Sequence, residues 1–256
     1  MTYCLGMLCR KGVVFLSDSR TSAGMDHITT RTKMRIFEKP GDRVICIMSS
    51  GNLSLSQATL ALIDDDLHLN ESHPARKHLL NRQTLYETVR YVGSKVREVE
   101  QRDRAALEAD GFSWNINLIV GGQIAGFEPE VHAIYPQGNS IHASVDCPYL
   151  QIGESKYGKP ILDRGLSFDS SLMDALKFGL ISMDATMKSN VAVGPPIDIL
   201  AYKTDSLQVR MRTRLEENDP YLTEIGQKWQ DGIVRLVRQM PIADFSKTAL
   251  GFANAA

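Results

Sequence analysis

Strand-like segments joined by tight turns constrain the fold of this chain more than any other feature of its sequence. Residues 2–9 and 13–17 flank the turn Arg10-Lys11-Gly12, and residues 33–38 and 44–48 flank the turn Pro40-Gly41-Asp42. Turns this short connect neighbouring antiparallel strands. The segment 44–48 is apolar at every position, which predicts a strand that is buried on both faces.

Helical patterns alternate with further strands along the rest of the chain. Leu85, Val89, Val92 and Val96 form one apolar stripe and predict a long amphipathic helix over residues 84–110. We expect other helices at about residues 54–65, 156–164, 170–188 and 221–238, the last with Trp229, Ile233, Leu236 and Val237 on its apolar side. Further strands are expected at 115–120, 130–135, 140–144, 150–152, 197–203 and 207–211, with Gly121-Gly122 as one of the turns.

The order of these segments predicts the architecture. Hairpin-connected strands favour antiparallel sheets, and two groups of amphipathic helices require apolar sheet faces to cover. We therefore expect an α+β fold, a four-layer αββα sandwich of two antiparallel sheets. Because the sequence contains no Pro-, Gly- or Ser-rich linker and no internal repeat, we expect residues 1–256 to form a single domain.

Charge and hydropathy exclude several classes of partner. With 29 basic and 30 acidic residues, the formal net charge is −1, which gives no electrostatic reason to expect nucleic acid or an anionic membrane. No apolar run approaches the roughly 20 residues that span a bilayer. Arg10 and Lys11 interrupt the opening apolar stretch, so we expect no signal peptide.

The cysteines and histidines do not form a metal-binding pattern. Cys4, Cys9, Cys46 and Cys147 are scattered without a C-x-x-C pair, which favours reduced thiols in the cytoplasm. Three histidines, His68, His73 and His78, lie in the polar stretch 66–81, which we expect to be a surface insertion. The sequence therefore predicts no metal and no cofactor.

The residue after the initiator methionine is a candidate nucleophile. Removal of Met1, which is usual before a small residue, leaves Thr2 with a hydroxyl and a free α-amino group. A terminal amine has an ordinary pKa of about 7.7–8.0 and can act as the base for its own hydroxyl. Asp18 follows at the end of the second strand, Lys33 opens the third, and Ser50-Gly51 breaks the buried strand.

Together these residues resemble a proteasome β-type subunit, a class of N-terminal-nucleophile hydrolase. The resemblance is carried by Thr2, the hairpin into Asp18-Ser19-Arg20, Ala23-Gly24, Lys33 before a strand, and the apolar strand into Ser49-Ser50-Gly51. It covers most of the chain and is most specific over residues 2–52. The Met-Thr start, Gly194-Pro195-Pro196 and the length are most similar to the bacterial ancestral β-subunit branch, Anbu.

The resemblance implies a role for each of these residues. Thr2 Oγ would attack a peptide carbonyl, Lys33 would lower the pKa of that hydroxyl, and Asp18 would orient Lys33 and balance its charge. Backbone N–H groups of Ser50 and Gly51 would form the oxyanion hole, worth roughly 2.7–4 kcal/mol per donor in other enzymes. An acyl-enzyme ester on Thr2 would then be hydrolysed by water.

The chain departs from the family pattern around the terminal amine. Where the family has a serine in a glycine-rich turn, this chain has Glu154, which could hold the Thr2 ammonium or bond elsewhere. Ser189 and Asn190 are the nearest candidates for the later supporting residues. The resemblance also places the specificity pocket near Thr21, Arg31, Arg35, Ile45, Ser49 and Leu53.

Three functions are compatible with this reading. The first is a threonine-type peptidase that acts on peptides or unfolded proteins inside a ring or ring-like spiral of identical subunits, an assembly implied by the resemblance. The second is a structural subunit of proteasome type without turnover. The third is an amidohydrolase for small amides, although such relatives typically expose Ser or Cys at the terminus. Retention of Thr2, Asp18 and Lys33 together favours the first.

Overall fold

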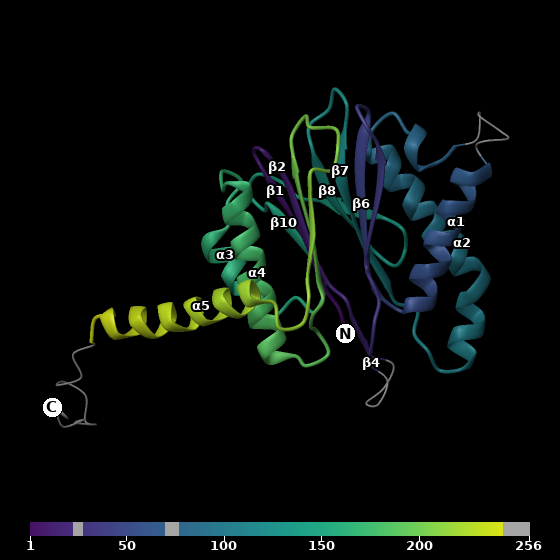
Figure 1. The fold of residues 1–256 in the computed structure, drawn as a ribbon. Coiled ribbons are helices and arrows are strands. Elements are labelled where there is room, and N and C mark those ends of the chain that lie inside the picture. Colours follow the sequence, from purple (N-terminus) through teal and green to yellow (C-terminus); the bar gives the residue numbers. More distant parts are fainter. Residues whose placement is uncertain (23–27, 70–76, 243–256) are drawn as a thin grey trace.

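The computed structural model describes residues 1–22, 28–69 and 77–242, and these residues form four layers (Figure 1). Two antiparallel five-stranded sheets pack face to face, with helices on both outer faces. The predicted αββα sandwich is therefore confirmed. Every strand pairing within the two sheets is antiparallel, as the short turns in the sequence require.

The strands divide between the two sheets in an order that brings distant segments together. The first sheet has the order β10 (Tyr149–Gly153), β1 (Tyr3–Cys9), β2 (Gly12–Asp18), β11 (Ile197–Lys203) and β12 (Met211–Leu215). The second has the order β5 (Met34–Lys39), β6 (Arg43–Gly51), β7 (Ile116–Ile124), β8 (Glu130–Ile134) and β9 (Ser140–His142). A ribbon of β3 (Arg20–Ser22) and β4 (Ile28–Thr30), which the sequence analysis did not predict, follows β2.

Helices cover the outer face of each sheet (Figure 1). On the second sheet lie α1 (Leu53–Leu69), the 3-10 helix η1 (Leu79–Asn81) and α2 (Leu85–Ala109). On the first sheet lie α3 (Lys159–Gly165) and α4 (Leu172–Ser189), with α5 (Pro220–Gln239) packed against α4. Thr84 caps α2 by accepting a hydrogen bond from Glu87 N–H, which satisfies one of the free donors at that helix end.

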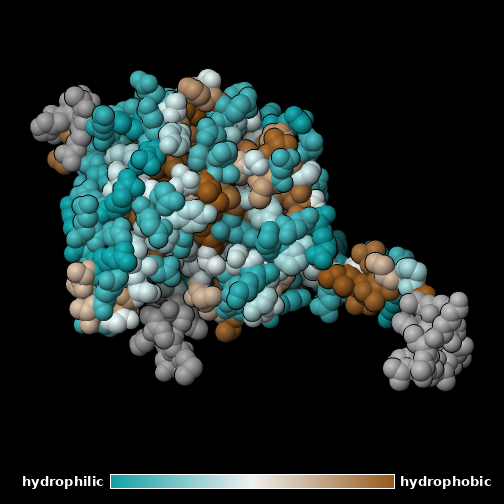
Figure 2. Space-filling model, turned by 180° about the vertical axis from the view of Figure 1, so that it is seen from behind, coloured by the Kyte–Doolittle hydropathy of each residue, from teal (hydrophilic) through white to brown (hydrophobic). Residues whose placement is uncertain are grey.

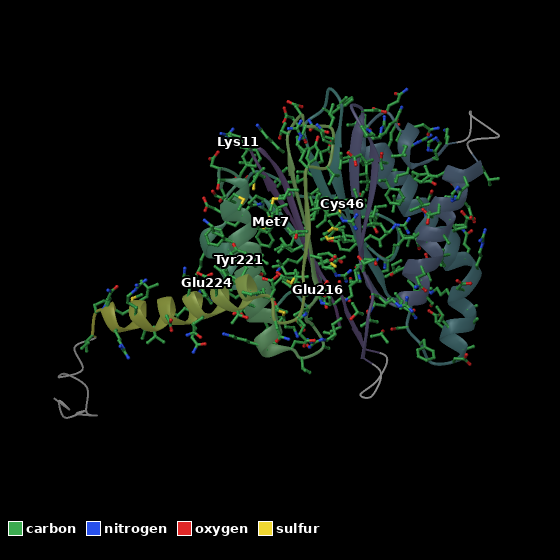
Figure 3. All side chains as sticks on the ribbon, in the orientation of Figure 1. Met7, Lys11, Cys46, Glu216, Tyr221 and Glu224 are labelled. Atoms are coloured by element: carbon green, nitrogen blue, oxygen red, sulfur yellow. The ribbon has the colours of Figure 1, made fainter. Side chains whose placement is uncertain are left out.

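Three apolar layers hold the sandwich together. Cys46 lies between the two sheets, and Met7 lies between the first sheet and α4 (Figure 3). Ile45, next to Cys46 in β6, points the opposite way toward α1 and α2. Because successive residues of β6 enter different layers, the strand must be apolar at every position, as the sequence of residues 44–48 predicted.

Gly121-Gly122, expected to be a turn, lies inside β7, so that prediction was wrong. The close approach of β6 explains the glycine. Gly122 has φ +141°, and a Cβ there would lie 2.0 Å from the carbonyl oxygen of Val44. Only glycine fits such a position, so a pair of glycines marks close backbone contact here instead of a turn.

The last hairpin is longer than expected. We predicted a strand at 207–211, whereas β12 runs from Met211 to Leu215. Asp205 and Leu207 have φ values of +61° and +41°, which extended strands do not allow. The buried Gln123 stabilises this loop, because it accepts a hydrogen bond from Asp205 N–H and donates one to the Asp205 carboxylate, both 2.8 Å.

The stretch 66–81, expected to be an irregular insertion, is partly helical. Helix α1 continues to Leu69, and the buried carboxylate of Asp66 forms an ion pair of 2.7 Å with Lys95 of α2. His78 caps η1 with its ring. His68 is exposed at the end of α1, and His73 lies outside the described residues.

Helix α5 extends past the body of the molecule (Figure 1). Leu222 and Gly226 are buried, and a Cβ on Gly226 would lie 2.7 Å from the Asp184 carboxylate of α4. Beyond them, apolar side chains remain between 41% and 63% exposed, namely Ile233, Val234, Leu236, Val237 and Met240. Figure 2 shows apolar side chains gathered on this projecting helix. The predicted apolar side exists, but only its first part enters the core.

In the part of the chain that the structure describes, no helix is both long enough and apolar enough to cross a membrane.

Candidate active site

Thr2 lies at the start of β1, at one end of the gap between the sheets. It is 9% exposed and lines a cavity of about 390 Å³ together with Met1, Thr21, Ser50 and Gly51. We call this the Thr2 cavity. The carbonyl oxygen of Thr2 accepts a hydrogen bond of 2.7 Å from the backbone N–H of Glu154, in the segment that follows β10. The pairing of β1 with β10 thus fixes the backbone of the candidate nucleophile.

The structure brings Asp18 and Lys33 together beside Thr2. Lys33 Nζ donates to Asp18 Oδ1 at 2.8 Å and to the Arg20 carbonyl oxygen at 2.7 Å. The same Asp18 oxygen accepts the N–H of Tyr3 at 2.9 Å. The Lys33 side chain is 7% exposed and that of Asp18 is 0% exposed, so this is a buried ion pair. The residue whose backbone N–H binds this ion pair, Tyr3, immediately follows Thr2.

Burial raises the pKa of Asp18 above its ordinary value, and four contacts act against that rise. These are the charge of Lys33, its hydrogen bond, and the N–H groups of Tyr3 and Gly194. Gly194 N–H lies 3.4 Å from Asp18 Oδ2. Each contact favours the charged carboxylate. A carboxylate with so many donors can hold an ammonium in one position, which is the role predicted for it.

A second buried carboxylate, Asp198 of β11, supports the residues on either side of this pair. Asp198 Oδ2 accepts hydrogen bonds from Ser19 Oγ at 3.1 Å and from Thr32 Oγ1 at 2.8 Å. Arg214 lies 3.6 Å from the other oxygen of Asp198. Because Ser19 follows Asp18 and Thr32 precedes Lys33, the carboxylate ties their two backbone segments together. Asp198 was not predicted from the sequence, since a single Asp in a strand carries no motif.

The end of β6 supplies backbone N–H groups next to Thr2. Ser49 N–H donates to the carbonyl oxygen of Lys33, and N–H directions alternate along a strand, so the N–H of Ser50 faces β7 and that of Gly51 faces the β5 side. β5 begins at Met34, which pairs with Met48, so the end of β6 extends beyond the first residue of β5. Of the two predicted oxyanion donors, Gly51 therefore has the direction that suits the task.

Of the three possible supporting residues, Glu154 and Asn190 contact each other, whereas Ser189 does not join them. Asn190 Nδ2 donates to Glu154 Oε2 at 3.1 Å, and Lys156 N–H donates to Glu154 Oε1 at 3.3 Å. Glu154 is 7% exposed. Ser189 is the exposed last residue of α4. Of the two alternatives for the Glu154 carboxylate, the structure has it bonded to Asn190 and Lys156.

The residues proposed for a specificity pocket do not all lie together. Arg31, Arg35, Ser49 and Leu53 line a second cavity of about 610 Å³, which also includes Arg214, and we call it the arginine cavity. Thr21 lines the Thr2 cavity instead. Ile45 points into the apolar layer under α1 and α2 and cannot contact a substrate.

Two asparagines, missed by the sequence analysis, complete the Thr2 cavity. Asn117 of β7 pairs with Ser50 of β6, and Asn115 directly precedes that strand. Gly51 allows this approach, since a Cβ there would lie 2.3 Å from the carbonyl oxygen of Asn115. Amide side chains can donate to and accept from a peptide. A single sequence offers no signal for them, because an asparagine near a strand start resembles any turn residue.

The neighbouring thiols do not compete with Thr2. Burial raises the pKa of the Cys4 thiol well above its ordinary value, and it lies inside the sheet layer with Cys46. A protonated thiol is a weak nucleophile.

Within the described residues, no group of three or more His, Cys, Asp or Glu side chains is arranged to hold a metal ion.

This fold, with its first strand starting in the cavity beside a buried Lys–Asp pair, defines a subunit of proteasome type. The chain belongs to the proteasome subunit family, whose model, described as "Proteasome subunit", matches residues 2–201. The predicted resemblance is thereby confirmed.

Solved structures identify the branch. The chain is 42% identical to Anbu (ancestral beta-subunit) from Yersinia bercovieri, with a TM-score of 0.86 over 94% of this chain and 99% of that one. It is 41% identical to the chain in a helical assembly of the Anbu complex from Pseudomonas aeruginosa, with a TM-score of 0.89 over 96% and 99%. Anbu from Hyphomicrobium sp. strain MC1 is 37% identical, with a TM-score of 0.86 over 94% and 99%. No curated protein sequence matches the chain.

The buried ion pair predicts a measurable stability pattern. Lys33→Met leaves the Asp18 carboxylate buried without a cation, so we expect a loss of roughly 3–5 kcal/mol in the free energy of unfolding at pH 8. Adding Asp18→Asn removes that charge, and the double variant should recover at least half of the loss. Urea unfolding of the parent, both single variants and the double variant measures this. Full additivity of the two single losses would contradict it.

The same variant should show a pH dependence of known sign. Without Lys33, the pKa of Asp18 rises further because its burial is no longer offset by a cation. The folded state then keeps a proton that the unfolded chain releases near its ordinary pKa of about 3.9. Stability is therefore full at low pH and falls as pH rises through the raised value. Lys33→Met should lose more stability relative to the parent at pH 8 than at pH 5.

Proposed function

We propose that this protein is a threonine-type peptidase that uses Thr2 as its nucleophile after Met1 is removed. One observation carries the proposal: the Lys33–Asp18 pair at 2.8 Å is anchored on the N–H of Tyr3, next to a threonine that opens into a cavity. A cation held near a hydroxyl favours its deprotonation, which is the role we propose for Lys33.

The proposed reaction needs only groups of this chain and water. Thr2 Oγ attacks the carbonyl carbon, and its proton passes to the relay of Lys33 and the terminal amine. The oxyanion is held by the N–H of Gly51, whereas the N–H of Ser50 faces β7 and takes no part. The C–N bond breaks, and the leaving amine takes the proton. Water then adds to the ester on Thr2, which releases the acid and restores the hydroxyl.

Labelling with an N-terminal-threonine reagent tests the nucleophile. We expect the intact mass of the purified protein to lack Met1, and a β-lactone to add one equivalent to Thr2. Thr2→Ala should not be labelled, and Thr2→Ser should be, because serine keeps both the hydroxyl and the amine. Retention of Met1 together with absence of an adduct would contradict the proposed peptidase function and leave a structural subunit of proteasome type. Comparing kcat/KM on peptides and on single-residue amides then separates a peptidase from an amidohydrolase.

We also propose that the Glu154 carboxylate raises the pKa of the terminal amine of Thr2. Its backbone donates to the Thr2 carbonyl oxygen at 2.7 Å, so Glu154 is held against the residue that bears the freed ammonium. A nearby negative charge raises the pKa of an amine. Glu154→Gln should therefore shift the pH midpoint of Thr2 labelling to lower pH. The matched control is Glu108→Gln, at the exposed end of α2, which should leave the midpoint in place. Equal midpoints for parent and Glu154→Gln would remove Glu154 from this role.

The proposed setting is a homo-oligomer in the cytoplasm. The four cysteines are free thiols, which suits a reducing compartment. The similar chain from Pseudomonas aeruginosa is described as part of a helical assembly. The exposed apolar face of α5 is a surface that another copy of this chain would cover.

Sedimentation velocity tests that surface. Val237 is 63% exposed, so Val237→Asp should fold normally and shift the distribution toward the monomer, because a charge cannot be buried unpaired in an interface. Tyr86→Asp, at a 57% exposed position of α2 on the opposite layer, is the control and should sediment like the parent. An unchanged distribution for Val237→Asp would exclude α5 from the contact.

A further inference from the structure

A smaller cavity adjoins the Thr2 cavity. It has a volume of about 250 Å³ and shares two wall residues, Asn117 and Gly153, with the Thr2 cavity. Asn117 pairs with Ser50, and Gly153 pairs with Tyr3. At Gly153 the backbones are so close that a Cβ would lie 2.0 Å from the Thr2 carbonyl oxygen. The smaller cavity therefore begins where the candidate nucleophile is fixed.

Most side chains that line this smaller cavity are apolar, with Asn117 and Gln151 as its amide residues, and we call it the apolar cavity. The apolar residues come from β8, β9, β10 and the residue after β8, and include Ala133, Tyr135, Ile141, Leu150 and Ile152. None of its lining residues, all in the described part of the chain, carries a charge. Ala133, Leu150 and Ile152 are buried, whereas Tyr135 and Ile141 are 37% and 45% exposed. The apolar lining thus continues from the layer between the sheets out to solvent.

The size of the apolar cavity limits what it can hold. An apolar cavity of about 150 Å³ in another protein binds benzene. A volume of about 250 Å³ therefore accommodates one phenyl or branched alkyl group. The arginine cavity differs in that charged residues, among them Arg31, Arg35 and Arg214, line it. The Thr2 cavity is thus bordered by an apolar recess on its β7 and β10 side.

We propose that the apolar cavity is a substrate subsite, which binds a phenyl or branched alkyl substituent of a substrate whose carbonyl is held at Thr2. The substrates are then amides or peptides with an apolar group next to the bond that is cleaved. The cavity is a binding site whether or not Thr2 turns over, but its role as a substrate subsite rests on the proposed function.

A matched series of β-lactones tests the subsite. Lactones that carry a methyl, a benzyl or a carboxymethyl substituent beside the ring carbonyl differ only in the group offered to the cavity. The readout is the second-order rate of adduct formation on Thr2, followed by intact mass. Burial of a phenyl group should make the benzyl lactone about tenfold faster than the methyl lactone, and the carboxymethyl lactone should be the slowest.

Variants at the mouth of the cavity locate the effect. Ile141→Asp should lower the benzyl-to-methyl rate ratio about tenfold, because it places a charge where the phenyl group binds. Ile141→Ala, which only shortens the side chain, should lower the ratio by about threefold. Val145→Asp is the matched control, since Val145 is 63% exposed and does not line the cavity. It should leave both rates as in the parent.

A binding measurement keeps the subsite separate from the nucleophile. N-(4-fluorobenzyl)acetamide is added to Thr2→Ala protein, and its binding is followed by fluorine NMR with and without Ile141→Asp. If no lactone labels Thr2, the proposed hydrolase function is wrong. The apolar binding site is still supported if the acetamide binds and Ile141→Asp abolishes that binding. If Thr2 is labelled, a benzyl-to-methyl ratio near one, or a ratio that Ile141→Asp does not change, overturns the subsite. Absence of both labelling and binding overturns both.

Discussion

The buried ion pair between Lys33 and Asp18 is the interaction on which the arrangement of this site depends. Asp18 receives donors from three segments, the start of β1, the start of β5 and the loop that contains Gly194. Removing two charges from water costs several kcal/mol per ion, so a buried pair contributes little net stability compared with an apolar pair. We therefore interpret the role of the pair as holding the Lys33 ammonium in position beside Thr2, and not as stabilising the core.

Fixing that ammonium requires more than one carboxylate. Lys33 and Asp18 come from different sheets, and the two sheets contact each other through apolar side chains, which resist sliding only weakly. Asp198 opposes such sliding because it binds Ser19 and Thr32 through one oxygen. Hydrogen bonds to a charged group are worth more than neutral ones and depend on direction. Asp18 thus holds the cation, and Asp198 holds the segments on either side of the ion pair, at Ser19 and Thr32.

Most of the fold was predictable because it follows from local patterns. The run at 44–48 and the stripe from Leu85 to Val96 specified layers, and the structure confirmed them. Errors arose where a tertiary contact decided the conformation, as at Gly122, whose backbone meets Val44, and at residues 207–211, where Gln123 stabilises a loop. In the site, Asp198, Asn115 and Asn117 were not predicted, because only the pairing of distant strands brings the asparagines to the Thr2 cavity and Asp198 to Ser19 and Thr32.

The position of Thr2 also explains why a second, mostly apolar cavity can adjoin the Thr2 cavity. β6 runs past the start of β5, while β10 and β7 lie on the other side of Thr2. Where strands of unequal length end, the sandwich is open, and side chains that would fill a core instead line a recess. Closing this end with longer strands would bury Thr2 and remove access to its hydroxyl. The unequal strand ends are therefore what allows one antiparallel sandwich to have both a dense core and an accessible first residue.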